Sequence, residues 1–154
     1  MESTDYSGVM DVDILTQKQY LGEKWNNLTK QERKECLVAR KPYYNEYLRE
    51  AYSFVAKLDN QIIGFLLAKK VGPYTNKLYI EYVAINPQYQ GMGMGLTLYE
   101  SLIKKARETG ISVIETVINI DNPNSIKLHE KAGFTLQDRK VAVLTCILGT
   151  SATP

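Results

Sequence analysis

The sequence predicts a single α/β domain, built on one mixed, mostly antiparallel sheet with helices on both faces. Its length of 154 residues is that of one ordinary domain. Three strand-like segments follow one another at residues 53–58, 62–70 and 78–86. A strand, helix, strand order over residues 78–120 then requires a parallel pair joined by a crossover. We expect residues 1–154 to form one domain whose core runs from about residue 9 to residue 148.

The first third of the chain is predicted to be mainly helical. Residues 9–15 alternate in polarity and predict a short strand, whereas residues 16–28 have apolar side chains at helical spacing. Thr29 and Glu32 form a capping-box pattern that opens a second helix, which should end before Pro42. The tyrosine-rich residues 43–52 are expected to be helical or irregular, and residues 1–7 and 149–154 to be frayed ends.

The remaining elements follow from turn and cap signals. Residues 59–61, Asp-Asn-Gln, predict a hairpin turn, because Asp and Asn tolerate left-handed backbone angles. A helix with an apolar stripe ends at Gly110, and a buried strand should fill residues 111–120. A short helix, capped by Asp121 or Asn122, is expected to end at Gly133. Residues 134–138 and 141–148 are predicted to close the sheet as an antiparallel pair.

Composition excludes several classes of function. The 19 basic residues nearly balance the 17 acidic residues, and charges of both signs alternate at residues 30–35, so we expect no nucleic-acid partner. The longest apolar runs are far shorter than the roughly 18 residues of a membrane helix. One histidine and two distant cysteines predict neither a metal site nor a disulfide framework. The N-terminal residues are polar and acidic, unlike a secretory signal, so we expect a cytoplasmic protein that does not contact a membrane.

A glycine-rich segment carries the strongest chemical signal. Gln90-Gly91-Met92-Gly93-Met94-Gly95 lies between a predicted buried strand and a predicted helix, where backbone N–H groups and the helix dipole can hold a phosphate. The alternative is a flexible surface loop. The dinucleotide-binding pattern fails because its third glycine falls on Leu96, and no Gly-Lys-Ser/Thr follows to make a P-loop.

Two motifs resemble one known family. Residues 79–95, from Tyr79 to Gly95, resemble the Gln/Arg-x-x-Gly-x-Gly/Ala signature of the GNAT superfamily of acetyl-CoA-dependent N-acetyltransferases. Residues 122–134 are similar to that family's second motif, with His129 where a tyrosine is usual. The resemblance implies an acyltransferase with acetyl-CoA as co-substrate, no metal, and a GNAT-like fold that contains a central splayed pair of parallel strands.

The same resemblance implies the residues that bind the co-substrate. Residues 90–95 would donate N–H groups to the pyrophosphate, and residues 83–85 would pair with the pantetheine arm as an added strand does. Asn122 and Ser125 would flank this arm. The complete set is Val83, Ala84, Ile85, Gln90, Gly91, Met92, Gly93, Met94, Gly95, Asn122 and Ser125.

Glu81 is the candidate general base. It is the only acid in an apolar and aromatic strand, and partial burial would suit it to take a proton from an ammonium group near neutral pH. The alternatives are an ion pair with a nearby Lys or Arg, or a side chain that points to solvent at a bulge.

His129 is the candidate acid for the leaving thiolate of CoA. An imidazole titrates nearer to neutral pH than a phenol does, so it also remains a candidate base. The alternative is a histidine that only packs, with its nitrogens bonded to backbone or water.

The acceptor is left open by the sequence. The resemblance implies that a primary amine attacks the thioester directly, and a small or amino-acid-like amine is favoured over a peptide or protein amine. Four of the eleven tyrosines fall within residues 43–52, where they would border the acceptor site or simply pack. A non-catalytic acyl-CoA-binding module and a nucleotide-binding protein are the rival interpretations. The apolar residues 141–148 would allow a homodimer.

Overall fold

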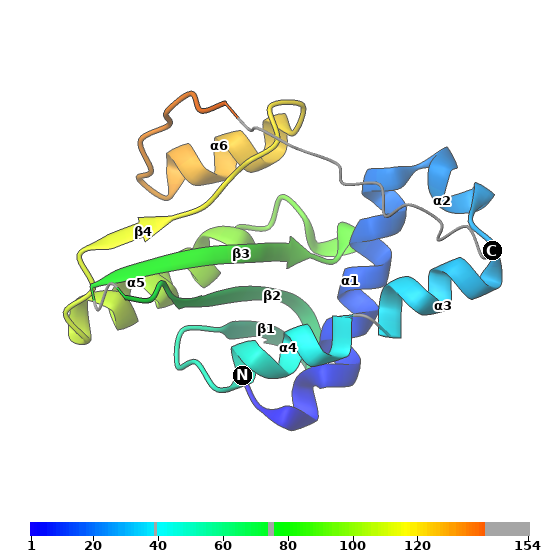
Figure 1. Ribbon diagram of the computed structural model, residues 1–154, viewed down its shortest axis with the longest axis horizontal. Coiled ribbons are helices and arrows are strands. Elements are labelled where there is room, and N and C mark those ends of the chain that lie inside the picture. Colours follow the sequence, from blue (N-terminus) through cyan, green and yellow to red (C-terminus); the bar gives the residue numbers. More distant parts are fainter. Residues whose placement is uncertain (39, 74–75, 141–154) are drawn as a thin grey trace, which may run out of the picture.

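A four-stranded mixed sheet forms the centre of the molecule. The computed structural model describes residues 1–38, 40–73 and 76–140. Within them the strands are β1 (Phe54–Leu58), β2 (Gln61–Lys70), β3 (Lys77–Ile85) and β4 (Val113–Glu115), in the order β1-β2-β3-β4. The first two pairings are antiparallel and the last is parallel (Figure 1). The predicted mixed, mostly antiparallel sheet is therefore confirmed.

Helices cover both faces of this sheet. The 3₁₀ helices are η1 (Ser3–Asp5) and η2 (Pro87–Tyr89), and the α-helices are α1 (Tyr6–Leu21), α2 (Glu23–Asn27), α3 (Lys30–Val38), α4 (Arg40–Leu48), α5 (Met94–Glu108) and α6 (Pro123–Lys131). In Figure 1, α5 lies behind the sheet, whereas α4 lies in front of β1. Helix α1 packs against β2 and β3 on the same side as α4.

Each face has its own apolar core. The core beneath α5 contains Tyr52, Leu66, Ala68, Leu78, Ile80, Leu98, Tyr99, Leu102, Ala106 and Ile111. The core beneath α1 and α4 contains Val9, Val12, Tyr44, Tyr47, Ile62, Phe65, Leu67 and Ala84. Strand β2 contributes to both, as expected for a central strand that is buried on both faces.

Local turn and cap signals are confirmed. Asp59 and Asn60 have φ angles of 47° and 67° in the turn between β1 and β2. The Thr29 hydroxyl accepts from the Glu32 N–H, and the Glu32 carboxylate accepts from the Thr29 N–H, which is the predicted capping box. Gly110 has a φ of 73° just beyond α5.

The expected strand at residues 9–15 is wrong, because these residues belong to α1. Val9 and Val12 are three positions apart and both are buried, so the helical period wins over the short alternation. Gly8 lets α1 approach β2, since a Cβ atom there would lie 2.9 Å from Cδ1 of Ile62. The expected frayed start is also wrong, because the carboxylate of Asp5 is buried and lies 2.7 Å from Nζ of Lys57.

The predicted helix at residues 16–28 is split in two. It is interrupted at Gly22, whose φ is 53°, and α2 follows. The helix that opens at Thr29 does end before Pro42, and α4 contains Pro42 in its first turn.

The last part of the sheet also differs from expectation. The predicted strand at residues 111–120 is reduced to β4, and Val117 and Ile120 are 63% and 93% exposed. Residues 134–138 form no strand, and the strand expected at residues 141–148 lies outside the described residues. The parallel pair β3–β4 is therefore at one edge of the described sheet.

Candidate active site

The candidate site begins where β4 leaves β3. Only three residue pairs join the two strands, Lys77 to Val113 through Tyr79 to Glu115. Beyond them the Thr116 hydroxyl donates to the Ile80 carbonyl at 2.9 Å, and the chain then rises toward α6 (Figure 1). The edge of β3 after Ile80 is thus without a strand partner among the described residues, as the expectation of a splayed pair required.

The alternation of the backbone decides which groups face this open edge. The Asn86 N–H donates to the Ile63 carbonyl at 2.8 Å, so the Ile85 carbonyl points away from β2. In an antiparallel pair the groups of one residue face one side, and those of the next residue face the other side. Val83 and Ile85 therefore direct their backbone to the open edge, whereas Ala84 directs its backbone toward β2.

The glycine loop follows β3 and η2 and leads directly into α5. From Gly91 to Leu96, no backbone N–H within the described residues donates a hydrogen bond to another backbone group; the first that does is Thr97, to the Gly93 carbonyl at 3.1 Å. Unpaired N–H groups at a helix start form a site for an anion. This arrangement favours the anion-binding interpretation over a loop without a binding role.

The three glycines of the loop serve two different purposes. Gly91 and Gly93 have φ angles of 79° and 83° in open surroundings, so their backbone conformation requires glycine. Gly95 lies within α5, where a Cβ atom would be 3.0 Å from a methyl group of Leu128. It therefore allows α6 to pack closely against α5.

Gln90 ties the loop to two other elements through its side chain. Its Nε2 donates to the Gln19 side chain at 2.9 Å and to the Ile85 carbonyl at 3.1 Å. Gln19 lies on α1, 71 positions earlier. Sequence reasoning missed Gln19, because nothing local marks a contact over such a separation.

Asn122 and Ser125 lie at the start of α6. The Asn122 side-chain oxygen accepts from the Ser125 N–H at 3.1 Å and so caps the helix. Asn119, just before this cap, donates to the Tyr20 hydroxyl on α1 at 3.0 Å. These contacts place α1 beside both the glycine loop and the start of α6.

Glu81 lies at a β-bulge in β3. Leu67 of β2 pairs with Tyr82 and Ala68 pairs with Ile80, so Glu81 has no partner on β2. Glu81 is exposed, which contradicts the partial burial that we expected and agrees with the bulge alternative. Its Oε2 accepts from the Tyr47 hydroxyl at 3.2 Å. Burial, followed by the charges of Glu81 and Glu115, raises the pKa of the nearby Tyr79 phenol.

His129 lies in the core, 2% exposed, between α5 and α6. Its Nδ1 is 2.7 Å from the Ser125 carbonyl, and its Nε2 is 2.6 Å from the Tyr99 hydroxyl. Burial lowers the pKa of His129, and the bond to the Ser125 carbonyl opposes this in part. This geometry favours the packing alternative over a proton donor at the open strand edge.

The tyrosines near residue 50 are mostly core residues. Tyr44 and Tyr52 are 2% and 4% exposed, which agrees with the packing alternative. Tyr47 is fully buried as well, yet its hydroxyl reaches Glu81. Its role as the partner of Glu81 carries no signal in the sequence.

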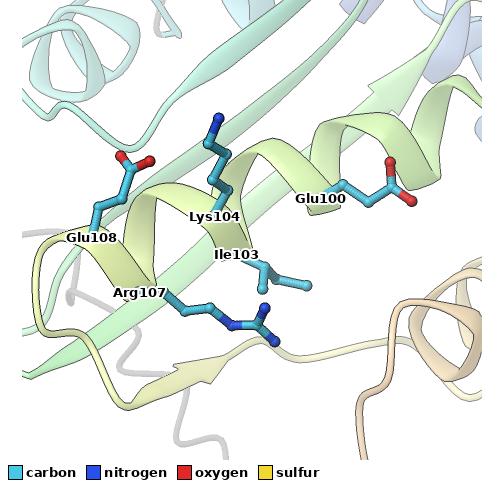
Figure 2. Close-up of a pocket in the computed structure, with 5 residues that line it drawn as sticks. All are labelled: Glu100, Ile103, Lys104, Arg107 and Glu108. Carbon is cyan, nitrogen blue, oxygen red and sulfur yellow. The ribbon is translucent and has the colours of Figure 1, made fainter.

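A surface hollow of about 440 Å³ lies elsewhere, along α5. Figure 2 shows its lining, Glu100, Ile103, Lys104, Arg107 and Glu108, all from this one helix. No groups from a second element converge on it, so it is not the candidate site. Within the described residues, no three His, Cys, Asp or Glu side chains gather as metal ligands, and no helix is long and apolar enough to cross a membrane.

The sequence of this chain resembles those of known acetyltransferases. The sequence model of the acetyltransferase (GNAT) family matches residues 19–134. L-2,4-Diaminobutyric acid acetyltransferase of Nocardia farcinica is 30% identical over 74 residues, which are 48% of this chain and 38% of that protein. Phosphinothricin N-acetyltransferase of Streptomyces viridochromogenes is 29% identical over 96 residues, 58% of this chain and 51% of that protein. The chain thus spans about a third to a half of these relatives.

Solved structures share the fold over nearly the whole chain. An aminoglycoside N-acetyltransferase, AAC(6')-Iy, in complex with CoA has a TM-score of 0.69 at 19% identity, with 94% of this chain and 91% of that chain covered. An aminoglycoside 6'-N-acetyltransferase of Acinetobacter haemolyticus has a TM-score of 0.67 at 16% identity, with 96% of both chains covered.

Proposed function

The chain belongs to the acetyltransferase (GNAT) family, and on that premise we propose that it transfers an acetyl group from acetyl-CoA to a primary amine. One observation supports this most strongly. The unpaired N–H groups at residues 91–96 lie directly after the strand edge that β4 leaves open. An anionic pyrophosphate and an amide-bearing arm are the ligand groups that fit such a pair of features.

Different groups of residues are proposed to bind different parts of acetyl-CoA. Residues 91–95 hold the pyrophosphate through their N–H groups, and Gln90 fixes the loop through its side chain. Val83 and Ile85 offer outward backbone groups to the pantetheine amides, and Asn122 and Ser125 flank the arm from α6. Ala84 lines the strand without offering backbone groups to the arm.

Glu81 acts as the general base in this proposal. The amine arrives as ammonium, and Glu81 takes its proton directly or through a water molecule. The amine nitrogen then forms a bond to the thioester carbonyl carbon, and the carbon–sulfur bond breaks to release the CoA thiolate. Glu81 suits this role because its partner among the described residues is a hydroxyl and not a cation.

His129 has a different role in this proposal. A carbonyl can only accept, so Nδ1 of His129 carries the hydrogen and Nε2 accepts from Tyr99. With both nitrogens engaged in the core, His129 supports the join between α5 and α6. The thiolate then takes its proton from solvent or from the attacking nitrogen, which is positively charged once the carbon–nitrogen bond has formed and loses a proton as the amide forms.

The acceptor is proposed to be a small or amino-acid-like amine. Support comes from the names of the relatives, which include acetyltransferases of diaminobutyric acid and phosphinothricin. The solved neighbours include enzymes that act on aminoglycosides. The near balance of charge in the chain gives no reason to favour an acidic macromolecule.

The test is a free-thiol assay with acetyl-CoA and a panel of amines that includes diaminobutyrate, phosphinothricin, an aminoglycoside and a short peptide. We expect thiol release with at least one small amine. Thiol release with the peptide alone would mean that the acceptor is a peptide amine and not a small amine. Acetyl-CoA binding without release for any amine would indicate a non-catalytic module, and tight NAD binding without CoA binding would contradict the proposal.

A further inference from the structure

The bulge in β3 aims Glu81 at the face covered by α1 and α4. Ile80 and Val83 both pack into the core beneath α5, whereas Tyr82 packs with the opposite core. At the bulge, the side chains of two consecutive residues, Glu81 and Tyr82, therefore lie on the same face of the sheet, which α1 and α4 cover. Glu81 consequently points toward α4 even though its side chain is exposed.

Tyr47 on α4 meets this carboxylate from inside the core. Its side chain has no exposed surface, so its ring is held by packing, and its hydroxyl lies 3.2 Å from Oε2 of Glu81. A free glutamate at the surface samples many rotamers, and holding it in one of them costs side-chain entropy. A donor fixed in the core lowers that cost at the moment of reaction, because one rotamer is already selected.

Lys69 on β2 lies beside the ring of Tyr47. Its Nζ lies 2.8 Å from the Glu46 carboxylate and 5.3 Å from the centroid of the Tyr47 ring. The hydrogen bond to Glu46 raises the pKa of Lys69, so it stays charged near neutral pH. Because a carboxylate can only accept, the Tyr47 hydroxyl gives its hydrogen to Glu81. The cation–π contact with Lys69 helps to hold the ring from which this hydroxyl extends.

We propose that Tyr47, whose ring Lys69 flanks, is a positioning residue that holds the Glu81 carboxylate so that Oε1 faces the incoming amine. This inference rests on the proposed function, since it assigns Glu81 as the base. The bond to Oε2 occupies one oxygen, and Oε1 has no hydrogen-bond partner within the part of the chain that the structure describes. Tyr47 is buried in the core beneath α1 and α4, so we expect it to act through Glu81.

The test compares Tyr47→Phe, Glu81→Gln and the double variant, with Tyr44→Phe as the matched control. Tyr44 lies one turn away on α4 and is equally buried, but its hydroxyl has no hydrogen-bond partner among the described residues. We expect Tyr47→Phe to lower kcat about tenfold or more, the range of a hydrogen bond to a charged group, with KM for acetyl-CoA unchanged. In the Glu81→Gln background, Tyr47→Phe should lower kcat no further. Tyr44→Phe should keep the kcat of the unmodified protein.

Lys69→Met provides a second route should Tyr47→Phe fold poorly. It keeps the Tyr47 hydroxyl and removes the cation beside its ring. We therefore expect a loss of kcat that is several-fold smaller than that of Tyr47→Phe and that again vanishes in the Glu81→Gln background. A Tyr47→Phe protein as active as the unmodified protein would overturn the inference, and so would losses that multiply in the double variant. An unmodified protein that releases no thiol with any amine would instead overturn the proposed function itself.

Discussion

The hydroxyl of Tyr99 on α5 lies 2.6 Å from Nε2 of His129 on α6, with both side chains buried. The two rings also meet edge to face, and Phe134 packs against both. This contact joins the helix that begins at the glycine loop to the helix that carries Asn122 and Ser125. It therefore holds the two sides of the proposed acetyl-CoA groove at a set distance.

Tyr99→Phe should destabilise the protein by about 1–3 kcal/mol, because it leaves a buried imidazole nitrogen without its donor. Tyr44→Phe removes an equally buried hydroxyl that has no partner among the described residues, so it should be neutral or slightly stabilising. Denaturant unfolding at pH 7.5 measures both changes. Equal losses in the two variants would mean that ring packing, not the hydrogen bond, decides the outcome.

The pH dependence of stability should carry the signature of His129. Burial lowers the pKa of His129 below its ordinary value of 6.5, so below that pH the unfolded chain binds a proton that the folded chain refuses. The free energy of unfolding should therefore be greatest above pH 6.5 and should fall as the pH drops from there toward the lower folded pKa.

The imidazole titration can be assigned without ambiguity, because His129 is the only histidine in the chain. A single imidazole signal in the proton NMR spectrum reports its titration directly. His129→Gln should remove the slope of stability that appears as the pH falls below 6.5. An unchanged slope in that variant, or an imidazole signal that titrates above 6.5, would contradict the buried neutral state.

Much of the fold could be predicted because its signals are local. The turn at Asp59 and Asn60, the capping box at Thr29 and the glycine loop each depend on a few adjacent residues. Residues 9–15 predict a strand although they form a helix, because a short alternation of polarity fits two periods, and only packing against β2 decides between them. Residues 111–120 predict a long strand because their composition is apolar, but composition does not show where this segment diverges from β3.

The candidate site also contains some residues that local motifs reveal and others that only the fold brings together. The glycine loop and the helix cap at Asp121 or Asn122 are contiguous motifs, so they could be predicted from the sequence. Tyr47 and Glu81 are 34 positions apart, and Gln19 and Gln90 are 71 apart, so only the folded chain brings them together. The burial of His129 likewise depends on which way α6 turns, which the spacing of residues does not determine.

Gly93→Ala should weaken acetyl-CoA binding and stability together. Its φ of 83° disfavours an L-residue by about 1–2 kcal/mol, and the open surroundings mean that the cost comes from the backbone alone. Gly110→Ala is the matched control, because Gly110 has a φ of 73° and open surroundings beyond the other end of α5. Both variants should lose similar stability in denaturant unfolding, while calorimetric titration should find weaker acetyl-CoA binding for Gly93→Ala only. If Gly110→Ala weakens binding equally, the loop is not the anion site.

Glu81→Gln should lower kcat by about 10²–10⁴-fold, the usual contribution of a general base. Binding of acetyl-CoA should not change, because Glu81 points to the α4 face and not to the glycine loop. Glu115→Gln is the control, since this carboxylate lies on the neighbouring strand but is already paired with Lys77 at 2.6 Å. A base must have a free lone pair for the ammonium proton, and Glu81 has one, whereas the ion pair with Lys77 engages Glu115. Steady-state kinetics of both variants with the best amine of the panel decides the matter: a Glu81→Gln protein within twofold of the unmodified kcat would mean that solvent, not Glu81, deprotonates the amine.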